Sequence, residues 1–482
     1  MPSYDVVLLH PPRVFREAET GLRSRLRGAL SGGRHQEPAP QYPLVSSGAF
    51  GLASGLAGEG FKVRLFNLAL EQFLNPSFSL ESFLRGVESE IYCIGLNWFV
   101  HCPGALEAAR ACKALRPDCL VVLGGLTASW FADQVMARPF IDAVVLGEAD
   151  ESLLDLVKAR FARRDLSEVN GLCYREHGQV RRTPPRQPPE NIDTPNGAEL
   201  SLLEHWEKYL RTSAAGFREG NVRAFWLSTA RGCRYNCIHC GGGREAYQLW
   251  TGRPECKFRS PERIADEIEE VVEKGVESVK LSHDPEMGGE KFASQLLREV
   301  KARQLDFQLY YESFRLPTEG FLRALRRCCA RVEVGVSPES ASEAVRGTVG
   351  KDFSNHDLLK AVEEIRRHGF GVRAFFSFGM PGETFGGLQA FASLARAILE
   401  RGGDVVPPFP YTIDPNCLMA VNPERYGVNL LLRSLDDYLE ACSSEEAIGW
   451  VGHETRELTR EGILRLTASA EAYVSQLYRR AR

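Results

Sequence analysis

Three cysteines, Cys233, Cys237 and Cys240, stand on one glycine-bounded loop, RGCRYNCIHCGGG, directly after the apolar run AFWLSTA. Three thiolates on one tight loop can ligate three irons of a cubane iron–sulfur cluster, which leaves the fourth iron open for an exogenous ligand. A closed structural zinc site needs four protein ligands. His239 lies between two of the cysteines and keeps a mixed zinc site as the alternative, but no second ligand pair is near. The loop therefore predicts a 4Fe–4S cluster at the end of a strand.

Apolar runs alternate with helical segments over the first 160 residues. Continuous apolar strands separated by helices form a parallel sheet that is covered on both faces. Ligands of such sheets bind beyond the carboxyl ends of the strands. We expect strands over 4–9, 62–68, 91–96, 119–123 and 141–146, and helices over 48–58 and 104–115.

A second strand–helix series begins near Phe225 and contains the cysteine loop after its first strand. About six strand–helix units fit an incomplete parallel barrel better than a full barrel of eight. The last 60 or so residues read as amphipathic helix. The expected strands of this series are 225–229, 277–281, 307–312, 331–336, 372–378 and 405–411, and the expected helices are 261–274, 292–303, 318–327 and 356–368.

These series predict an α/β protein with a Rossmann-like domain of flavodoxin type, a partial (β/α)6 TIM barrel and a helical C-terminal region. Residues 181–197 carry five prolines and few apolar side chains, as is typical of a linker. We therefore expect the first domain at 1–165, a linker at 166–215, the barrel at 216–410, and a barrel-closing and helical region at 411–482.

Composition excludes several classes of protein. The net charge of −4 gives no field that would gather nucleic acid, and no aromatic–basic stripe is present. The N-terminus, MPSYDVVLLHPP, lacks a basic leader, and no apolar run approaches the roughly 20 residues of a membrane helix. Thirteen cysteines in such a chain fit free thiols in a reducing compartment. We expect a cytoplasmic protein without a transmembrane segment.

The cysteine loop resembles the motif of the radical S-adenosylmethionine (SAM) superfamily, and its position after the first barrel strand is similar too. The resemblance implies that SAM chelates the open iron and is split by an electron to methionine and a 5′-deoxyadenosyl radical. In this superfamily the residue before the last cysteine is usually aromatic. Here it is His239, whose backbone is still expected near the adenine.

Other positions resemble the SAM site of the superfamily. Glu339 and Ser340 follow the strand ARVEVGVS, where the family often has Glu-Ser facing the ribose or the amino group of SAM. A carboxylate at a helix N-terminus is the alternative for Glu339. By resemblance, Arg373 on the next strand reaches the methionyl carboxylate. Gly379 and Pro381 belong to GMPGET, a segment similar to one common in cobalamin-linked members, and are expected near the adenine.

A Rossmann-like domain before such a barrel resembles the cobalamin-binding radical SAM subclass, and the resemblance extends from Val6 to about Leu466. It is strongest to a group of uncharacterised cobalamin-domain proteins. The usual Asp-x-His-x-x-Gly motif is absent, so we expect no protein histidine on cobalt, although His101 lies in the loop after the third strand. A vestigial domain that binds nothing, or only substrate, is the alternative. The residues expected near cobalamin are His10, Asn97, Gly124, Gly125 and Gly147.

The resemblance implies a cobalamin-dependent methyltransferase that acts on an unactivated carbon or a phosphinate of a small molecule, such as a natural-product or lipid precursor. It also implies an electron donor such as flavodoxin or ferredoxin. The alternatives are a ring-forming, coupling or rearranging enzyme that uses cobalamin differently or not at all, and a non-enzymatic sensor, which would need no open iron. Within 411–427, Tyr411, Asp414 and Asn416 are candidate substrate contacts, and this segment is expected to close the barrel.

Overall fold

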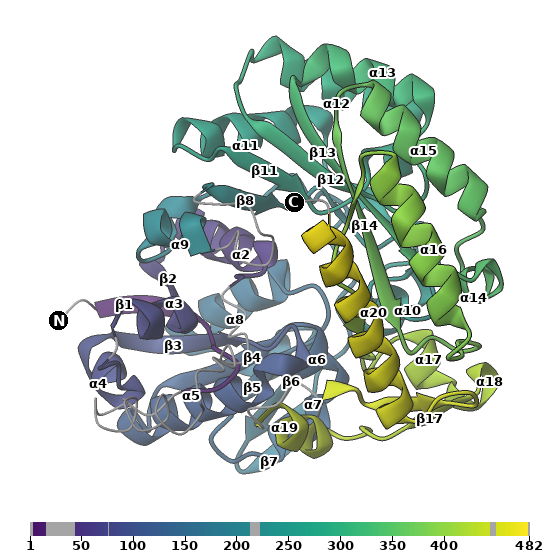
Figure 1. The fold of residues 1–482 in the computed structure, drawn as a ribbon. Coiled ribbons are helices and arrows are strands. Elements are labelled where there is room, and N and C mark those ends of the chain that lie inside the picture. The colour runs from purple at the N-terminus through teal and green to yellow at the C-terminus, as the bar shows by residue number, and fades with distance from the viewer. Residues whose placement is uncertain (1–2, 16–43, 76, 213–221, 444–449, 481–482) are drawn as a thin grey trace.

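A computed structural model describes residues 3–15, 44–75, 77–212, 222–443 and 450–480. Figure 1 shows two sheets, one in an N-terminal unit and one in a larger curved unit that carries most of the outer helices. The boundary that we expected at residues 215 and 216 lies outside the described residues. Within those residues, no helix combines the length and the apolar character needed to cross a membrane.

The first sheet has seven strands in the order β2-β1-β3-β4-β5-β6-β7. Its first five strands are parallel, and the order 2-1-3-4-5 is that of flavodoxin-like sheets. All five strands predicted from apolar runs are present. The strands are β1 (Ser3–His10), β2 (Val63–Asn67), β3 (Glu88–Gly95), β4 (Leu120–Gly124), β5 (Ala143–Val145), β6 (Leu172–Glu176) and β7 (Gln179–Arg182).

Both faces of this sheet are buried because successive side chains of a strand point to opposite faces. Along β1, Val6 and Leu8 pack in one apolar cluster, and Val7 and Leu9 pack in another. Helices α2 (Ser47–Gly58) and α8 (Asp150–Ala162) cover the first face, and α4 (Leu80–Gly86), α5 (Cys102–Leu115) and α7 (Ala132–Met136) contribute to the second cluster. The shorter helices are α3 (Leu68–Leu74) and α6 (Leu126–Trp130).

The second sheet is an open barrel. Its strands run in the order β15-β14-β13-β12-β11-β8, so β8 and β15 lie at the two ends of the sheet, and β16 adds to β14. All these pairings are parallel, as expected for an incomplete barrel. The strands are β8 (Ala224–Leu227), β11 (Ser278–Leu281), β12 (Gln308–Ser313), β13 (Arg331–Glu339), β14 (Gly371–Phe378), β15 (Asp404–Val405) and β16 (Phe409–Pro410).

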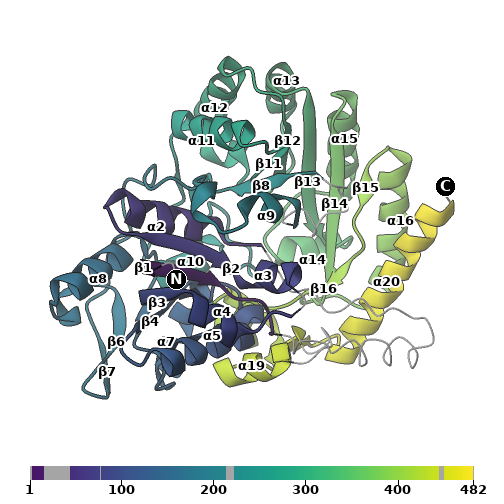
Figure 2. The same ribbon diagram turned by 90° about the vertical axis from the view of Figure 1, so that its left-hand side faces the viewer.

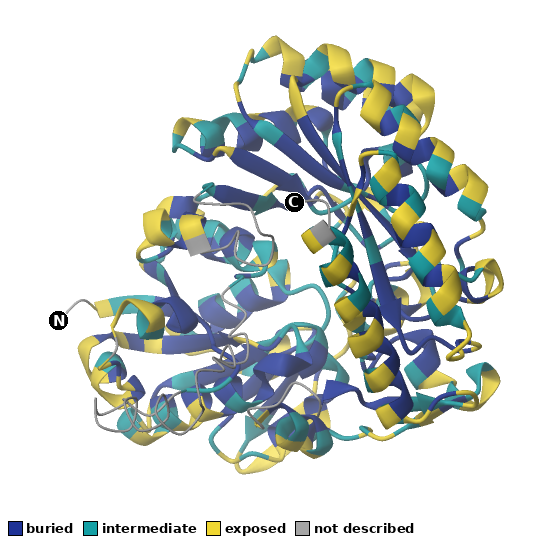
Figure 3. Ribbon diagram, in the orientation of Figure 1, coloured by how far each residue is buried: buried dark blue, intermediate teal, exposed yellow. Residues whose placement is uncertain are grey.

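Amphipathic helices cover the outside of the barrel, with their exposed faces outward (Figure 3). They are α11 (Pro261–Glu273), α12 (Glu290–Ala302), α13 (Glu319–Cys328), α14 (Glu343–Thr348), α15 (Asn355–Arg367) and α16 (Gly387–Glu400). The two units share one core, because Phe50 of α2 meets Phe225 of β8 with ring centroids 5.4 Å apart.

The C-terminal region joins both units. Helix α20 (Arg460–Arg480) runs beside α16 (Figure 2), whereas α19 (Leu435–Ser443) packs on α5 of the first unit. The expected helical character is present, but β17 (Val428–Leu430) and β18 (His453–Thr455) form a short antiparallel pair between the helices. The remaining helices are α17 (Leu418–Val421) and α18 (Pro423–Tyr426).

The range 166–215 is more structured than a linker. Strands β6 and β7 form an antiparallel hairpin that extends the first sheet, and α9 (Trp206–Thr212) follows. His177 and Gly178 turn the hairpin with φ values of 47° and 80°, the conformation that two-residue hairpin turns require. The side chains of β7 are all exposed, which is why this edge strand carries no apolar pattern.

Candidate functional site

The cysteine loop leaves the carboxyl end of β8 and is framed by a two-stranded ribbon. Strand β9 (Ala230–Arg231) precedes the cysteines and pairs antiparallel with β10 (Lys257–Phe258). Helix α10 (Arg244–Thr251) begins directly after the glycines that follow the last cysteine. The ribbon and the helix therefore hold the two ends of the loop.

A buried histidine holds the backbone just before the first cysteine. His283 Nε2 donates to the carbonyl oxygen of Gly232 over 3.1 Å, and Nδ1 accepts from Ser282 Oγ at 2.7 Å. Burial lowers the pKa of His283 to about 4, so the ring is neutral near pH 7 and keeps both roles. His283 therefore positions the chain that leads into Cys233.

The three thiols are half-buried and influence one another. Burial raises the pKa of Cys233 to about 11 and also raises the pKa of Cys240. The Cys240 N–H donates to the Cys237 carbonyl oxygen over 3.2 Å, so a tight turn separates these two cysteines. The Tyr235 N–H donates to Cys233 Sγ over 3.4 Å, a contact that favours a thiolate.

This arrangement fits a cubane cluster better than a zinc ion. No three His, Cys, Asp or Glu side chains among the described residues gather tightly enough to hold one metal ion. A cubane needs wider spacing, because each thiolate binds a different iron. His239 does not join the thiols as a ligand, since its Nε2 lies 3.6 Å from Glu339 Oε1.

Glu339 ends β13 beside the cysteine loop. Its carboxylate accepts from Lys351 Nζ at 2.7 Å and from Ser377 Oγ at 3.1 Å. Burial alone would raise the pKa of Glu339, but the Lys351 ammonium and His239 hold it well below its usual range. The structure thus brings together Glu339 and His239, two residues predicted for one site, and adds Lys351.

Lys351 is buried and was not predicted from the sequence. Its segment packs on the cysteine loop, because the carbonyl oxygen of Val349 accepts from Ile238 N at 3.3 Å. Burial lowers the pKa of Lys351, but the Glu339 carboxylate and, after it, Cys237 raise this pKa above its usual range. A single lysine after a glycine carries no sequence signal, and only the fold places its ammonium near the thiols.

Ser340 and the GMPGET segment line one hollow of about 280 Å³. The buried Glu383 carboxylate also lines it and accepts from Gly379 N at 2.7 Å. His453 Nε2 donates to the Gly379 carbonyl oxygen over 2.7 Å, so both backbone groups of this glycine are used within the protein. Pro381 is buried in the same turn. Gly379 and Pro381 therefore shape the turn beside the hollow.

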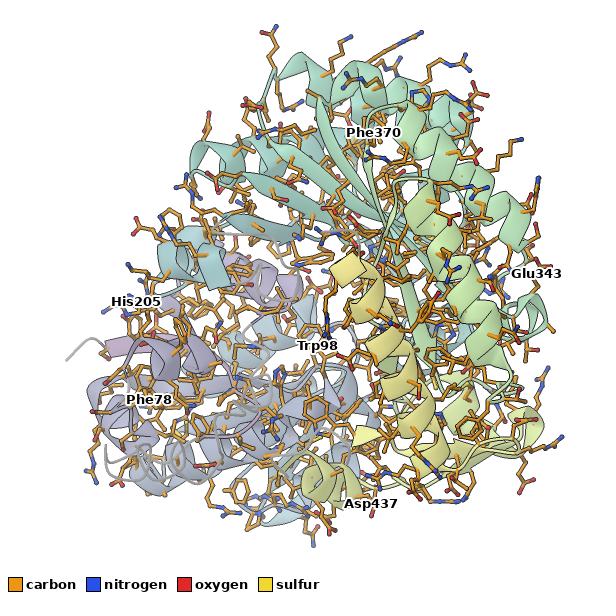
Figure 4. All side chains as sticks on the ribbon, in the orientation of Figure 1. Phe78, Trp98, His205, Glu343, Phe370 and Asp437 are labelled. Atoms are coloured by element: carbon orange, nitrogen blue, oxygen red, sulfur yellow. The ribbon has the colours of Figure 1, made fainter. Side chains whose placement is uncertain are left out.

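Arg373 is not brought to this group. It lies near the start of β14 and pairs with Glu333, whereas Glu339 is in register with Phe376, three residues further along the strand. Three residues correspond to about 10 Å. Figure 4 labels Phe370, just before this strand, at the end of the barrel that is far from the N-terminal unit. Arg373 is therefore left out of the candidate site.

The three expected substrate contacts hold the cysteine loop instead. The Tyr411 hydroxyl donates to the carbonyl oxygen of His239, and Asn416 Nδ2 donates to the carbonyl oxygen of Gly241 over 2.8 Å. Asp414 Oδ2 accepts from Gly241 N at 3.2 Å. These polar atoms are used within the protein, so residues 411–416 act on the loop.

The residues expected near cobalamin lie at the carboxyl ends of β1, β3, β4 and β5. The rings of His10 and His101 meet edge to face at 4.9 Å. The Asn97 side chain accepts from Leu126 N at 3.2 Å and so joins the loops after β3 and β4. Figure 4 labels Trp98 where this unit faces the barrel.

The three glycines differ in their surroundings. A Cβ on Gly125, where φ is +105°, would lie 2.8 Å from the Asn97 backbone, so the turn itself requires glycine. A Cβ on Gly147 would lie 3.2 Å from the Trp250 carbonyl oxygen of α10. A Cβ on Gly124 would meet only Val145, at 3.9 Å. Of the three, Gly124 has the least crowded surroundings.

A buried ion-pair cluster joins the two carboxyl edges. Glu148, after β5, accepts from Arg253 Nε at 2.6 Å and from Arg231 Nη1 at 2.8 Å. Arg231 also donates twice to Asp150, at 2.6 and 2.7 Å, and the Tyr247 hydroxyl donates to Glu148. Because Arg231 lies two residues before Cys233, this cluster connects the first sheet to the cysteine loop. Sequence reasoning missed it.

Comparison with known proteins adds a family and several relatives. Residues 227–395 match the model of the radical SAM superfamily. An uncharacterised methyltransferase of Pyrococcus horikoshii is 28% identical over 335 residues, which cover 67% of this chain and 69% of that protein. An anaerobic magnesium-protoporphyrin IX monomethyl ester cyclase of Rubrivivax gelatinosus is 28% identical over 309 residues, or 61% of this chain and 52% of the cyclase.

The fold also has a solved relative. A structure of TsrM from Kitasatospora setae, a radical SAM methyltransferase with cobalamin and a 4Fe–4S cluster bound, aligns with a TM-score of 0.66. The alignment covers 99% of this chain and 91% of TsrM at 18% identity, which establishes likeness of fold. The two-unit architecture is therefore shared over nearly the whole chain.

Proposed function

We propose that this chain, whose residues 227–395 form a radical SAM domain, is a cobalamin-dependent methyltransferase that acts on an unactivated carbon or a phosphinate of a small molecule. A radical SAM domain implies a 4Fe–4S cluster and SAM. The observation that carries the proposal is the loop of three thiols, which Arg231 and Glu148 tie to the carboxyl edge of a flavodoxin-like sheet. This ion pair holds the edge of the sheet where cobalamin would bind next to the loop where the cluster would bind.

Cys233, Cys237 and Cys240 would hold the cluster, with Glu339, Lys351 and the hollow beside Ser340 arranged for SAM. When bound, these cofactors supply a 5′-deoxyadenosyl radical and a methyl group. The chain's own residues would position them. Lys351 Nζ donates to Glu339 and to the Ser337 carbonyl oxygen, and its third N–H is the one that would be offered to a carboxylate. Glu339 would accept from hydroxyl or amino groups with the lone pairs that Lys351 and Ser377 leave.

Lys351 takes the role in SAM binding that the sequence suggested for Arg373. Replacing Lys351 by Met should weaken SAM binding about 10- to 100-fold, because a charge-assisted contact contributes about 1.5–3 kcal/mol. Arg373→Met removes a cation from the same barrel and should leave the affinity unchanged. Equilibrium dialysis of SAM with the cluster-loaded proteins measures both. Weaker binding in Arg373→Met with unchanged binding in Lys351→Met would reverse the assignment.

The N-terminal unit is proposed to bind cobalamin without a histidine on cobalt. Its strand order creates a crevice at the carboxyl edge, the place where flavodoxin-like sheets bind their cofactors. His10, the last residue of β1, and His101, after β3, lie against each other, and the Asn97 side chain accepts from Leu126 N. Backbone and apolar contacts would then hold the nucleotide tail.

Retention of hydroxocobalamin after desalting tests this proposal. The wild type should retain about one equivalent, and Gly124→Val should lose most of it, because a Cβ there makes only an ordinary contact with Val145 at 3.9 Å, so the larger side chain would compete with the cofactor. Gly86→Val is the control, since a Cβ on that glycine, at the end of α4, meets nothing within 4 Å. If the folded wild type retains no hydroxocobalamin, the proposed methylcobalamin mechanism is wrong. Full retention by Gly124→Val would remove Gly124 from the site.

A ring-forming, coupling or rearranging reaction is the second candidate, and the similarity to a magnesium-protoporphyrin ester cyclase favours it. It would be preferred if SAM is cleaved but no cobalamin is retained. Either reaction needs a one-electron donor such as flavodoxin or ferredoxin. We further propose a reducing compartment, the cytoplasm, because the cysteines are free thiols. A natural-product or lipid precursor is the proposed substrate class.

A further inference from the structure

A strap over residues 411–419 crosses the cysteine loop between its second and third cysteines. Besides the contacts of Tyr411, Asp414 and Asn416, the Met419 N–H donates to the carbonyl oxygen of Ile238 over 3.0 Å. A Cβ on Gly241 would lie 2.5 Å from Asn416 Oδ1 and 2.9 Å from Asp414 Oδ2. The strap therefore lies in direct contact with the backbone that carries Cys240.

Each of the three thiols has a different charged neighbour. Arg315 lies over the ring of Tyr235, two residues after Cys233, at 3.9 Å, and Lys351 follows Gly350, on which a Cβ would lie 3.4 Å from Cys237 Cα. Cys240 instead precedes Gly241, whose N–H donates to Asp414 Oδ2 over 3.2 Å, so a carboxylate lies beside this thiol. Cationic side chains thus lie near Cys233 and Cys237, and an anionic side chain lies near Cys240.

We propose that Asp414 is a positioning residue that lowers the reduction potential of the cluster, through a fixed negative charge beside Cys240 and a hydrogen bond from Gly241. This inference rests on the proposed function, since it requires a cluster on the triad. Adding an electron to a cluster costs more beside a negative charge, and a half-buried site screens that charge less than water does. A lower potential makes the reduced cluster a stronger donor of the electron that splits SAM.

The hydrogen bond and the charge make separate contributions. The Gly241 N–H donates to Asp414 Oδ2, and an asparagine oxygen can accept the same bond without the charge. Tyr411→Phe, in contrast, removes a strap contact to His239 and leaves the charge in place. The two variants therefore distinguish an electrostatic role from a structural one.

The test is a redox titration of the reconstituted full chain, followed by electron paramagnetic resonance. Asp414→Asn should shift the midpoint potential of the cluster to more positive values. Asp306→Asn is the matched control, because that carboxylate is 90% exposed and pairs with Arg331 at the start of β13. Tyr411→Phe should keep the wild-type potential while losing iron faster to a chelator. An unchanged or more negative potential in Asp414→Asn would overturn the proposal.

Two further outcomes are decided by the same series. If Asp414→Asn holds no cluster, Asp414→Glu should restore both cluster content and the wild-type potential, and failure to do so overturns the electrostatic role. If the folded wild type itself assembles no cluster, the proposed function fails rather than this inference. A cluster with wild-type potential in every variant leaves the proposed function intact and overturns only the role of Asp414.

Discussion

Replacing Cys233, Cys237 and Cys240 together by alanine will abolish cluster binding completely. In the proposed site each thiolate would ligate a different iron, so removing all three leaves the cubane without protein ligands on this loop. The three cysteines stand within eight residues of one loop, and the Cys240 N–H donates to the Cys237 carbonyl oxygen. The measurement is the visible absorption of the anaerobically reconstituted protein, together with iron and sulfide per chain.

The controls use cysteines outside the triad. Cys256 lies nearest, with its thiol donating to the Gly232 carbonyl oxygen over 3.6 Å, and Cys256→Ala should keep a full cluster. Cys328 and Cys329, whose sulfurs lie 3.5 Å apart at the end of α13, should also be dispensable. A full cluster in the triple variant would show that these thiols ligate it. Loss of the cluster in Cys256→Ala would make Cys256 a fourth participant.

Removing the Glu148 carboxylate should cause the largest loss of stability of any single change discussed here. Glu148→Ala leaves Arg231 and Arg253 without their shared partner at a site where the Glu148 side chain is 4% exposed. Removing one partner of a buried ion pair typically costs about 3–5 kcal/mol, because the remaining charge stays buried. Urea-induced unfolding followed by fluorescence measures the effect.

The neighbouring residue Glu151 provides a matched control. It pairs with Arg186 at 2.8 Å, but its side chain is 53% exposed, and exposed pairs contribute about 0.2–1 kcal/mol. Glu151→Ala should therefore change the unfolding midpoint only slightly. Equal losses in both variants would contradict the view that Glu148 is the contact that fixes the first sheet to the cysteine loop.

Strands and their order of appearance could be predicted because buried parallel strands are continuous apolar runs. LVVLG is such a run, and the structure forms β4 from it. The hairpin of β6 and β7 was missed because β7 is polar and lies at the edge of the sheet. A pattern of buried residues cannot reveal a strand that buries none.

The sequence predicts a site where chemistry and spacing coincide along the chain, as in the cysteine loop, and the structure brings His239 of that loop to Glu339, with 3.6 Å between Nε2 and Oε1. The roles of these residues stay predictions. The sequence does not show how far along a strand each side chain lies. Arg373 and Glu339 lie on neighbouring strands, but the register, with an irregularity between Val336 and Glu339, leaves Arg373 near the opposite end. Lys351 reaches Glu339 only because the chain after β13 returns to the cysteine loop. No local sequence pattern shows where a chain turns back after a strand to contact an earlier loop.

The most direct test of the central claim is electron paramagnetic resonance of the anaerobically reconstituted and reduced wild type, with and without SAM. We expect about four irons per chain and the signal of a reduced 4Fe–4S cluster. Addition of SAM should change that signal clearly, because SAM would ligate the iron that the three cysteines leave open. A folded protein that binds no iron, or a cluster signal that SAM leaves unchanged, would contradict it.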